Sequence, residues 1–235
     1  MFGYYGFGMF FDPTMIILVP ALIVSAWAQF KVSSTFNEYQ KIQSFNRYSG
    51  SNVARMLLDD AGLYDVSIEI VRGKLSDHYD PINRVLRLSS DIYSGTSVAA
   101  LGVAAHEVGH AIQHKEKYGA LILRNSIAPA VNFASSMSWL LFIAGIILGF
   151  SGLTTIGIVL FSAVVVFQLV TLPVEFNASS RALKLLEQRG ILYGNEVDGA
   201  KKVLNAAALT YVAATLMAVS QLLRLIVLSD RNSNR

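Results

Sequence analysis

Four long apolar runs, separated by polar stretches, dominate the hydrophobic pattern of this chain of 235 residues. The runs cover roughly residues 15–32, 130–150, 153–174 and 206–228. Each is about as long as the ~17–25 residues that a helix uses to cross the hydrocarbon core of a bilayer. The pattern therefore predicts four membrane-spanning helices. The second and third should be antiparallel neighbours, because only Ser151-Gly152 joins them.

The last run is the least regular of the four, because it contains Gln221 and Arg224. It could instead form a buried or interfacial helix, with the charged end of Arg224 reaching the interface. Three spans are then the alternative.

The polar region after the first run predicts a small α+β unit. Apolar residues every three positions over 36–45 predict an amphipathic helix, and a second helix should end near Gly62. Alternation over 66–71 predicts a strand, 73–81 a turn, and 84–88 the return strand of a short β-hairpin. An edge of that hairpin is the candidate place for a substrate strand.

Composition points to the same class of protein. The chain is 53% hydrophobic and 15% charged, with a mean hydropathy of +0.47, whereas soluble proteins carry about 25% charged residues. The net charge of +3 and the lack of a basic stripe argue against nucleic acid as a partner. With no cysteine, the chain has neither disulfides nor a thiolate site. The lipid bilayer is the expected surrounding.

The positive charges predict the orientation in the cell membrane. Lys and Arg gather between the first and second runs and again after the third. The opposite side has none before the first run or at 151–152, and only Arg231 and Arg235 in the tail. Because cytoplasmic segments carry the excess of Lys and Arg, both polar regions should face the cytoplasm.

The candidate chemistry lies in His106-Glu107-Val108-Gly109-His110, on a helix expected to begin at Thr96 or Ser97. Residues four apart lie on the same face of a helix, so both imidazoles can bind one Zn²⁺ ion. This is the H-E-x-x-H pattern of zinc hydrolases, in which Glu107 would act as general base toward a water activated by the metal. The alternative is a polar patch on a structural helix, which would be costly to bury without a partner.

Two neighbouring residues are weaker candidates. His114 continues the same helical face, but it lies about 12 Å along the axis from His106. It should therefore face solvent or a lipid headgroup. Glu116 holds the position of the third His in metzincins, yet the Gly that their turn requires is Gln113 here. Glu116 should be a surface charge.

A catalytic zinc site usually has three protein ligands, so one more is required. The residues alone leave His78, Glu116, Glu175 or an Asp as candidates. Glu175 ends the third apolar run, on the side of the membrane that carries the motif, although it could simply pair with Arg181. His78 and Tyr211 are candidates for stabilising the oxyanion.

Three segments resemble YugP-type membrane zinc metallopeptidases of bacteria: residues 75–81, 97–113 and 172–179. Those proteins are in turn similar to the HtpX-like and CAAX prenyl-protease group, whose third zinc ligand is a distant Glu. The resemblance implies that Glu175 is this ligand, because residues 175–179 match the group's E-x-x-A-D pattern except that Ser179 replaces Asp. A hydroxyl, Asn177 or another group would then support a ligand His.

The sequence thus predicts a mainly α integral-membrane protein with about four transmembrane helices and a small cytoplasmic α+β zinc-peptidase region. We expect one Zn²⁺ ion, held by His106, His110 and Glu175, and cleavage of membrane or membrane-proximal proteins. A catalytically silent, metal-stapled scaffold is the alternative, while a transporter is disfavoured because no inverted repeat is visible. The substrate and oligomeric state stay open.

The expected segments follow from these features. They are 1–32 (N-terminal tail and first membrane helix), 33–127 (metallopeptidase region), 128–174 (membrane helical hairpin), 175–204 (third-ligand segment and loop) and 205–235 (last membrane helix and tail).

Overall fold

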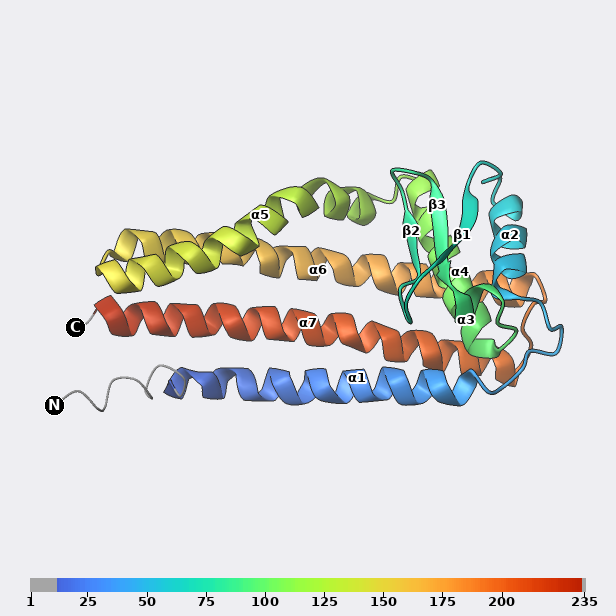
Figure 1. Ribbon diagram of the computed structural model, residues 1–235, viewed down its shortest axis with the longest axis horizontal. Helices are drawn as coiled ribbons and strands as arrows, with labels where there is room; N and C mark the ends of the chain where they lie inside the picture. Colours follow the sequence, from blue (N-terminus) through green and yellow to red (C-terminus); the bar gives the residue numbers. More distant parts are fainter. Residues whose placement is uncertain (1–11, 234–235) are drawn as a thin grey trace. The chain divides into compact units, whose positions relative to one another are not determined.

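A computed structural model describes residues 12–233, so most of the predicted N-terminal tail lies outside the described part. The fold is mainly helical, with a small three-stranded mixed sheet (Figure 1). In chain order the elements are a 3₁₀ helix η1 (Pro13–Leu18), α1 (Val19–Tyr39), α2 (Gly50–Asp60), β1 (Ser67–Val71), β2 (His78–Asp80), β3 (Val85–Ser89), α3 (Ser90–Tyr93), α4 (Val98–Lys115), α5 (Gly119–Leu148), α6 (Ser151–Gln188) and α7 (Asn195–Ser233).

The chain forms two compact units. The described part of the first, called the bundle unit here, comprises 12–27, 124–170 and 211–233. The second, called the site unit, comprises Ala28–Leu123 and Thr171–Thr210. The long helices α1, α5, α6 and α7 contribute residues to both units.

Within residues 12–233, four helical segments are long and apolar enough to cross a membrane, as the hydrophobic pattern predicts. They include α7, so the irregular last run lies within one uninterrupted helix that is a candidate span. Many of their apolar side chains are exposed, for example Ile147 at 73% and Val159 at 62%. Exposed apolar surface on this scale fits contact with lipid rather than water.

The helical hairpin of α5 and α6 is packed closely through small residues. A Cβ atom added at Gly157 would lie 2.8 Å from the Ser138 carbonyl oxygen, and one at Gly145 would lie 2.6 Å from the Thr154 nitrogen. Small residues at such positions let two membrane helices approach each other. The predicted antiparallel pair is therefore present, but the turn lies at Gly149-Phe150, with Gly149 at φ +64°, because Ser151 and Gly152 already belong to α6.

Arg224 has polar partners inside the bundle unit. Its Nε donates a hydrogen bond to Thr14 Oγ1 at 3.2 Å, and its Nη2 lies 4.0 Å from Asp12 Oδ2. Charged side chains in membrane helices are costly unless they are paired. These contacts explain how α7 tolerates an arginine within its apolar run.

The core of the site unit is built around α4. Ser97 caps the start of α4 by accepting a hydrogen bond from the Ala100 N–H at 3.2 Å, as expected for an N-cap residue. Side chains of α2 and of the sheet pack against this helix, and Leu57, Leu86 and Leu101 are fully buried. Apolar residues surround α4, as in a helix buried on all sides.

The predicted β-hairpin is wrong in its pairing. β1 and β3 are parallel, with Ser67 opposite Val85 and Val71 opposite Ser89. The segment predicted as a turn contains β2, which pairs antiparallel with β3. Because β3 is the central strand, it offers no free edge to a substrate. Alternation of side chains identifies the faces of a strand but not its partner or direction.

The predicted amphipathic helix over 36–45 is also wrong. α1 ends at Tyr39, and the residues up to α2 form turns, bends and an isolated bridge between Gln43 and Ser97. The Asn46 side-chain amide donates to the Gly190 carbonyl at 3.0 Å, while the Phe45 side chain is 84% exposed. This segment is therefore held by a contact with the chain at Gly190, and not by the amphipathic helix that its local periodicity suggested.

One close approach in the site unit yields a test. A Cβ atom at Gly109 of α4 would lie 2.7 Å from the Ala178 carbonyl oxygen of α6, which is too close for an alanine without a backbone shift. We expect Gly109→Ala to destabilise the fold by about 1–3 kcal/mol, as overpacking does, and to lower the thermal midpoint in detergent micelles. Gly102→Ala is the matched control, because its Cβ would meet Ala200 Cβ at an ordinary 3.5 Å. Equal midpoints for the two variants would contradict the packing argument.

Candidate metal centre

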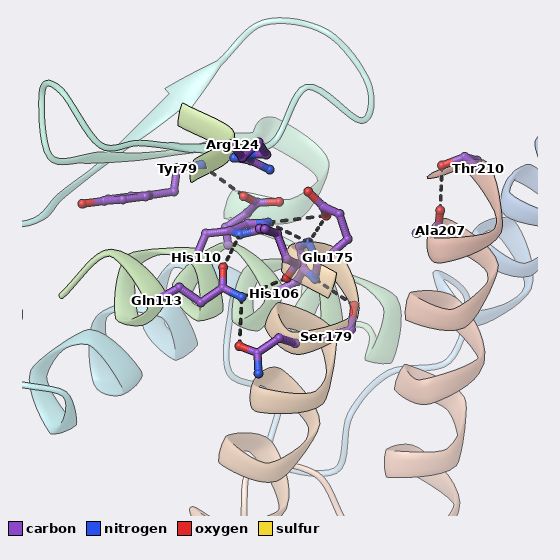
Figure 2. Close-up of polar contacts among 12 residues, drawn as sticks. Tyr79, His106, His110, Gln113, Arg124, Glu175, Ser179, Ala207 and Thr210 are labelled. Carbon is purple, nitrogen blue, oxygen red and sulfur yellow. Dashed lines mark hydrogen bonds and ion pairs between the residues drawn. The ribbon is translucent and has the colours of Figure 1, made fainter. Parts of the chain in front are cut away.

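Two helices supply the candidate centre, each with a pair of residues one turn apart. His106 and His110 lie on α4, and Glu175 and Ser179 lie on α6. Residues four apart share a face of a helix, so each pair points in one direction. Figure 2 shows the two imidazoles and the Glu175 carboxylate pointing toward one another. All four residues belong to the site unit.

The three predicted ligands form a compact triangle of donor atoms. His106 Nε2 lies 3.1 Å from His110 Nε2 and 3.3 Å from Glu175 Oε2, and His110 Nε2 lies 3.6 Å from that oxygen. Zn–ligand bonds of about 2.0–2.1 Å in a tetrahedron imply donor separations of about 3.4 Å. Both His110 and Glu175 are buried. The chemistry and spacing of this donor set therefore fit a zinc ion.

The hydrogen bonds behind the two imidazoles support this fit. His106 Nδ1 lies 3.1 Å from Ser179 Oγ, and His110 Nδ1 lies 3.0 Å from Gln113 Oε1. When both Nδ1 atoms carry the proton, two Nε2 lone pairs and a carboxylate oxygen meet in one buried place. Such a set of acceptors requires a cation, either a metal ion or a proton.

The electrostatics of His110 reflect the same convergence. Burial by itself lowers the pKa of this imidazole, but the hydrogen bond to Glu175 and the charge of Glu107 leave its pKa above the usual value. The neighbouring carboxylates thus favour positive charge at this point. A divalent cation would satisfy them without a proton on the ring.

Glu107 lies beside the donor triangle but is not one of its members. Its side chain is buried, and its Oε2 accepts a hydrogen bond from the Tyr79 backbone N–H at 3.1 Å. The Tyr79 hydroxyl lies 3.0 Å from His114 Nδ1, two turns further along α4. The edge strand β2 therefore holds a carboxylate next to the site.

Sequence reasoning missed the role of Tyr79, because the segment around it was predicted to be a turn. His114 was expected to face solvent or a headgroup; it is instead half buried against Tyr79. No local pattern could have shown this contact, since 35 residues separate the two side chains in the chain.

The other candidates lie elsewhere. Glu116 is half exposed and pairs with Arg181 at 2.7 Å, as a surface charge does. His78 is exposed, with its Nδ1 2.8 Å from the Ser76 carbonyl oxygen. Tyr211 lies on α7, and its proposed part in stabilising an oxyanion stays a prediction. Within residues 12–233, the group of His, Asp and Glu placed to hold a metal is His106, His110 and Glu175.

Comparisons with known proteins agree with this chemistry. Residues 14–230 match the family described as "Putative neutral zinc metallopeptidase". The chain is 54% identical over 222 residues to the "Putative membrane protease YugP" of Bacillus subtilis (strain 168), covering 94% of this chain and 99% of that relative. No solved structure matches the chain.

The triangle of donor atoms predicts which substitutions remove the metal. His106→Ala, His110→Ala and Glu175→Ala should each weaken zinc binding by more than the about 10–100-fold that loss of an outer partner costs. Elemental analysis of the purified protein and competition with a chelator would measure this. Glu116→Ala is the control and should retain zinc. Full zinc occupancy in Glu175→Ala would show that this ligand assignment is wrong.

Proposed function

Because this chain belongs to the family described as "Putative neutral zinc metallopeptidase", we propose that it is a membrane-embedded zinc endopeptidase. It would hydrolyse peptide bonds of membrane or membrane-proximal proteins with a metal-activated water. The observation that carries the proposal is the buried Glu107 carboxylate beside the triangle of His106, His110 and Glu175. A membrane location is consistent with the four candidate spans.

The residues of α4 and α6 have distinct parts in the proposed reaction. His106, His110 and Glu175 would hold zinc, which when bound lowers the pKa of a water molecule to about 7. Glu107 would accept the proton of the attacking water and return it to the leaving nitrogen of the peptide bond. The Tyr79 N–H bond to Glu107 Oε2 orients this carboxylate before the substrate arrives.

The number of ligands favours catalysis over a scaffold. Structural zinc sites usually have four protein ligands, whereas catalytic sites have three and keep one position open. The donor group on α4 and α6 has three members within the described residues. A scaffold would also have no use for the carboxylate of Glu107. These two features together favour the peptidase.

We also propose that the site unit faces the cytoplasm. The support is the concentration of Lys and Arg in the polar regions of that unit and the absence of charge at residues 149–152, where α5 is followed by α6. With the site on this side, the substrates would be the cytoplasmic or membrane-proximal parts of proteins.

The general base can be tested by Glu107→Gln. The amide can still accept from the Tyr79 N–H, and Glu107 is not a proposed ligand, so the fold and zinc content should be unchanged. Cleavage of a casein-like substrate should fall by about 10²–10⁴-fold, the usual contribution of a general acid–base group. Glu116→Gln should cleave at the normal rate, and a chelator should stop wild-type cleavage. Near-normal turnover by zinc-loaded Glu107→Gln would rule out the mechanism.

The orientation can be tested by cysteine labelling, because the chain has no native cysteine. Ile82 is 90% exposed in the site unit, and Ser151 is the first residue of α6, directly after the turn that follows α5. In intact cells an impermeant thiol reagent should label Ser151→Cys but not Ile82→Cys. Permeabilised cells should show labelling of Ile82→Cys. If intact cells label Ile82→Cys, the cytoplasmic assignment is wrong.

A further inference from the structure

We infer that Gln113 is a positioning residue that determines which ring nitrogen of His110 faces the metal site. The Gln113 side chain is fully buried at the end of α4. Its Oε1 lies 3.0 Å from His110 Nδ1, and its Nε2 donates to the Val174 carbonyl oxygen at 2.8 Å and to Asn177 Oδ1 at 2.9 Å. Figure 2 shows Gln113 beside His110. The inference rests on the zinc site proposed above, but not on proteolysis.

The orientation of the Gln113 amide follows from its partners. A backbone carbonyl can only accept a hydrogen bond, so the amide nitrogen must be the atom facing Val174. Asn177 Oδ1 must be an acceptor too, because Arg181 Nε donates to the same atom at 2.7 Å and a guanidinium can only donate. These two acceptors therefore place Gln113 Nε2 toward α6, which leaves Gln113 Oε1 facing His110.

The tautomer of His110 follows in turn. Since Gln113 Oε1 accepts, His110 Nδ1 must carry the proton, which leaves the lone pair on Nε2. That Nε2 is the atom in the donor triangle with His106 and Glu175. The network thus prepares His110 as a metal ligand before any metal arrives. His106 has no such constraint, because the Ser179 hydroxyl can either donate or accept.

Gln113 also joins the two helices that supply the ligands. Val174, whose carbonyl it holds, immediately precedes Glu175 in α6. One side chain therefore contacts the second ligand directly and the backbone next to the third. Arg181 also pairs with the exposed Glu116 at 2.7 Å, but through Nη2 rather than through the Nε that donates to Asn177, so Glu116 is outside the hydrogen bonds that orient Gln113.

The test compares Gln113→Met with Gln113→Glu in the full-length protein in detergent, with Glu116→Ala as the control. Met is close to Gln in size but makes no such hydrogen bonds, so zinc affinity measured by chelator competition should fall about 10–100-fold. The Glu variant keeps an acceptor for the His110 Nδ1–H and should stay closer to the wild-type affinity. Glu116→Ala should match wild type.

The two variants distinguish positioning of His110 from a role in which Gln113 only links α4 to α6. If Gln113 affected zinc binding only through its hydrogen bonds to α6, Gln113→Glu would lower the affinity more than Gln113→Met, because it places a carboxylate against the Val174 carbonyl. Wild-type affinity in Gln113→Met, or weaker binding in Gln113→Glu than in Gln113→Met, would therefore overturn the inference. Thermal midpoints of the chelator-treated proteins report on folding independently of the metal.

If Gln113→Met does not fold, Gln113→Glu decides alone: an affinity within about tenfold of wild type supports the inference, and a larger loss overturns it. The proposed function fails in a different way. Wild-type protein that bound zinc but cleaved nothing would end the peptidase proposal and leave the role of Gln113 intact. Wild-type protein that bound no zinc would end both.

Discussion

The convergence of two imidazole nitrogens and a carboxylate oxygen in a buried place is the constraint on which the site unit depends. Acceptors at separations of 3.1–3.6 Å are stable together only around a cation. Bringing them together requires α4 and α6 to approach closely, and Gly109 permits this by leaving room for the Ala178 backbone. The close packing at Gly109 and the metal site at His106 and His110 therefore both require this turn of α4 to lie against α6.

The parts of the site that were predictable are those that repeat at a regular spacing. His106 and His110 are four residues apart on a helix predicted to begin at Thr96 or Ser97, close to the observed start at Val98. The long apolar runs identified the four candidate membrane helices of the described residues by their length and composition. For Glu175, the residues left several candidates open, and only the resemblance singled it out. The structure now places it beside both His residues.

The parts that could not be predicted depend on contacts between distant segments. β2 has three residues, too few for a periodic signal, and its partner β3 also pairs in parallel with β1. The bond from Tyr79 to Glu107 exists only because β2 crosses α4. In the sequence, Gln113 was noticed only because it stands where metzincins have the glycine of their turn. Its function depends on the partners that α6 brings to it.

The pairs on α4 and α6 have a mechanical consequence. Because Glu175 and Ser179 are one turn apart, sliding α6 along α4 by about 5.4 Å would exchange a carboxylate for a hydroxyl at the same place. A bound ion would therefore fix the position of α6 along α4 and link these two helices, which α5 separates in the chain. Zinc would then stabilise the folded site unit by binding to it, apart from any peptide that the protein cuts.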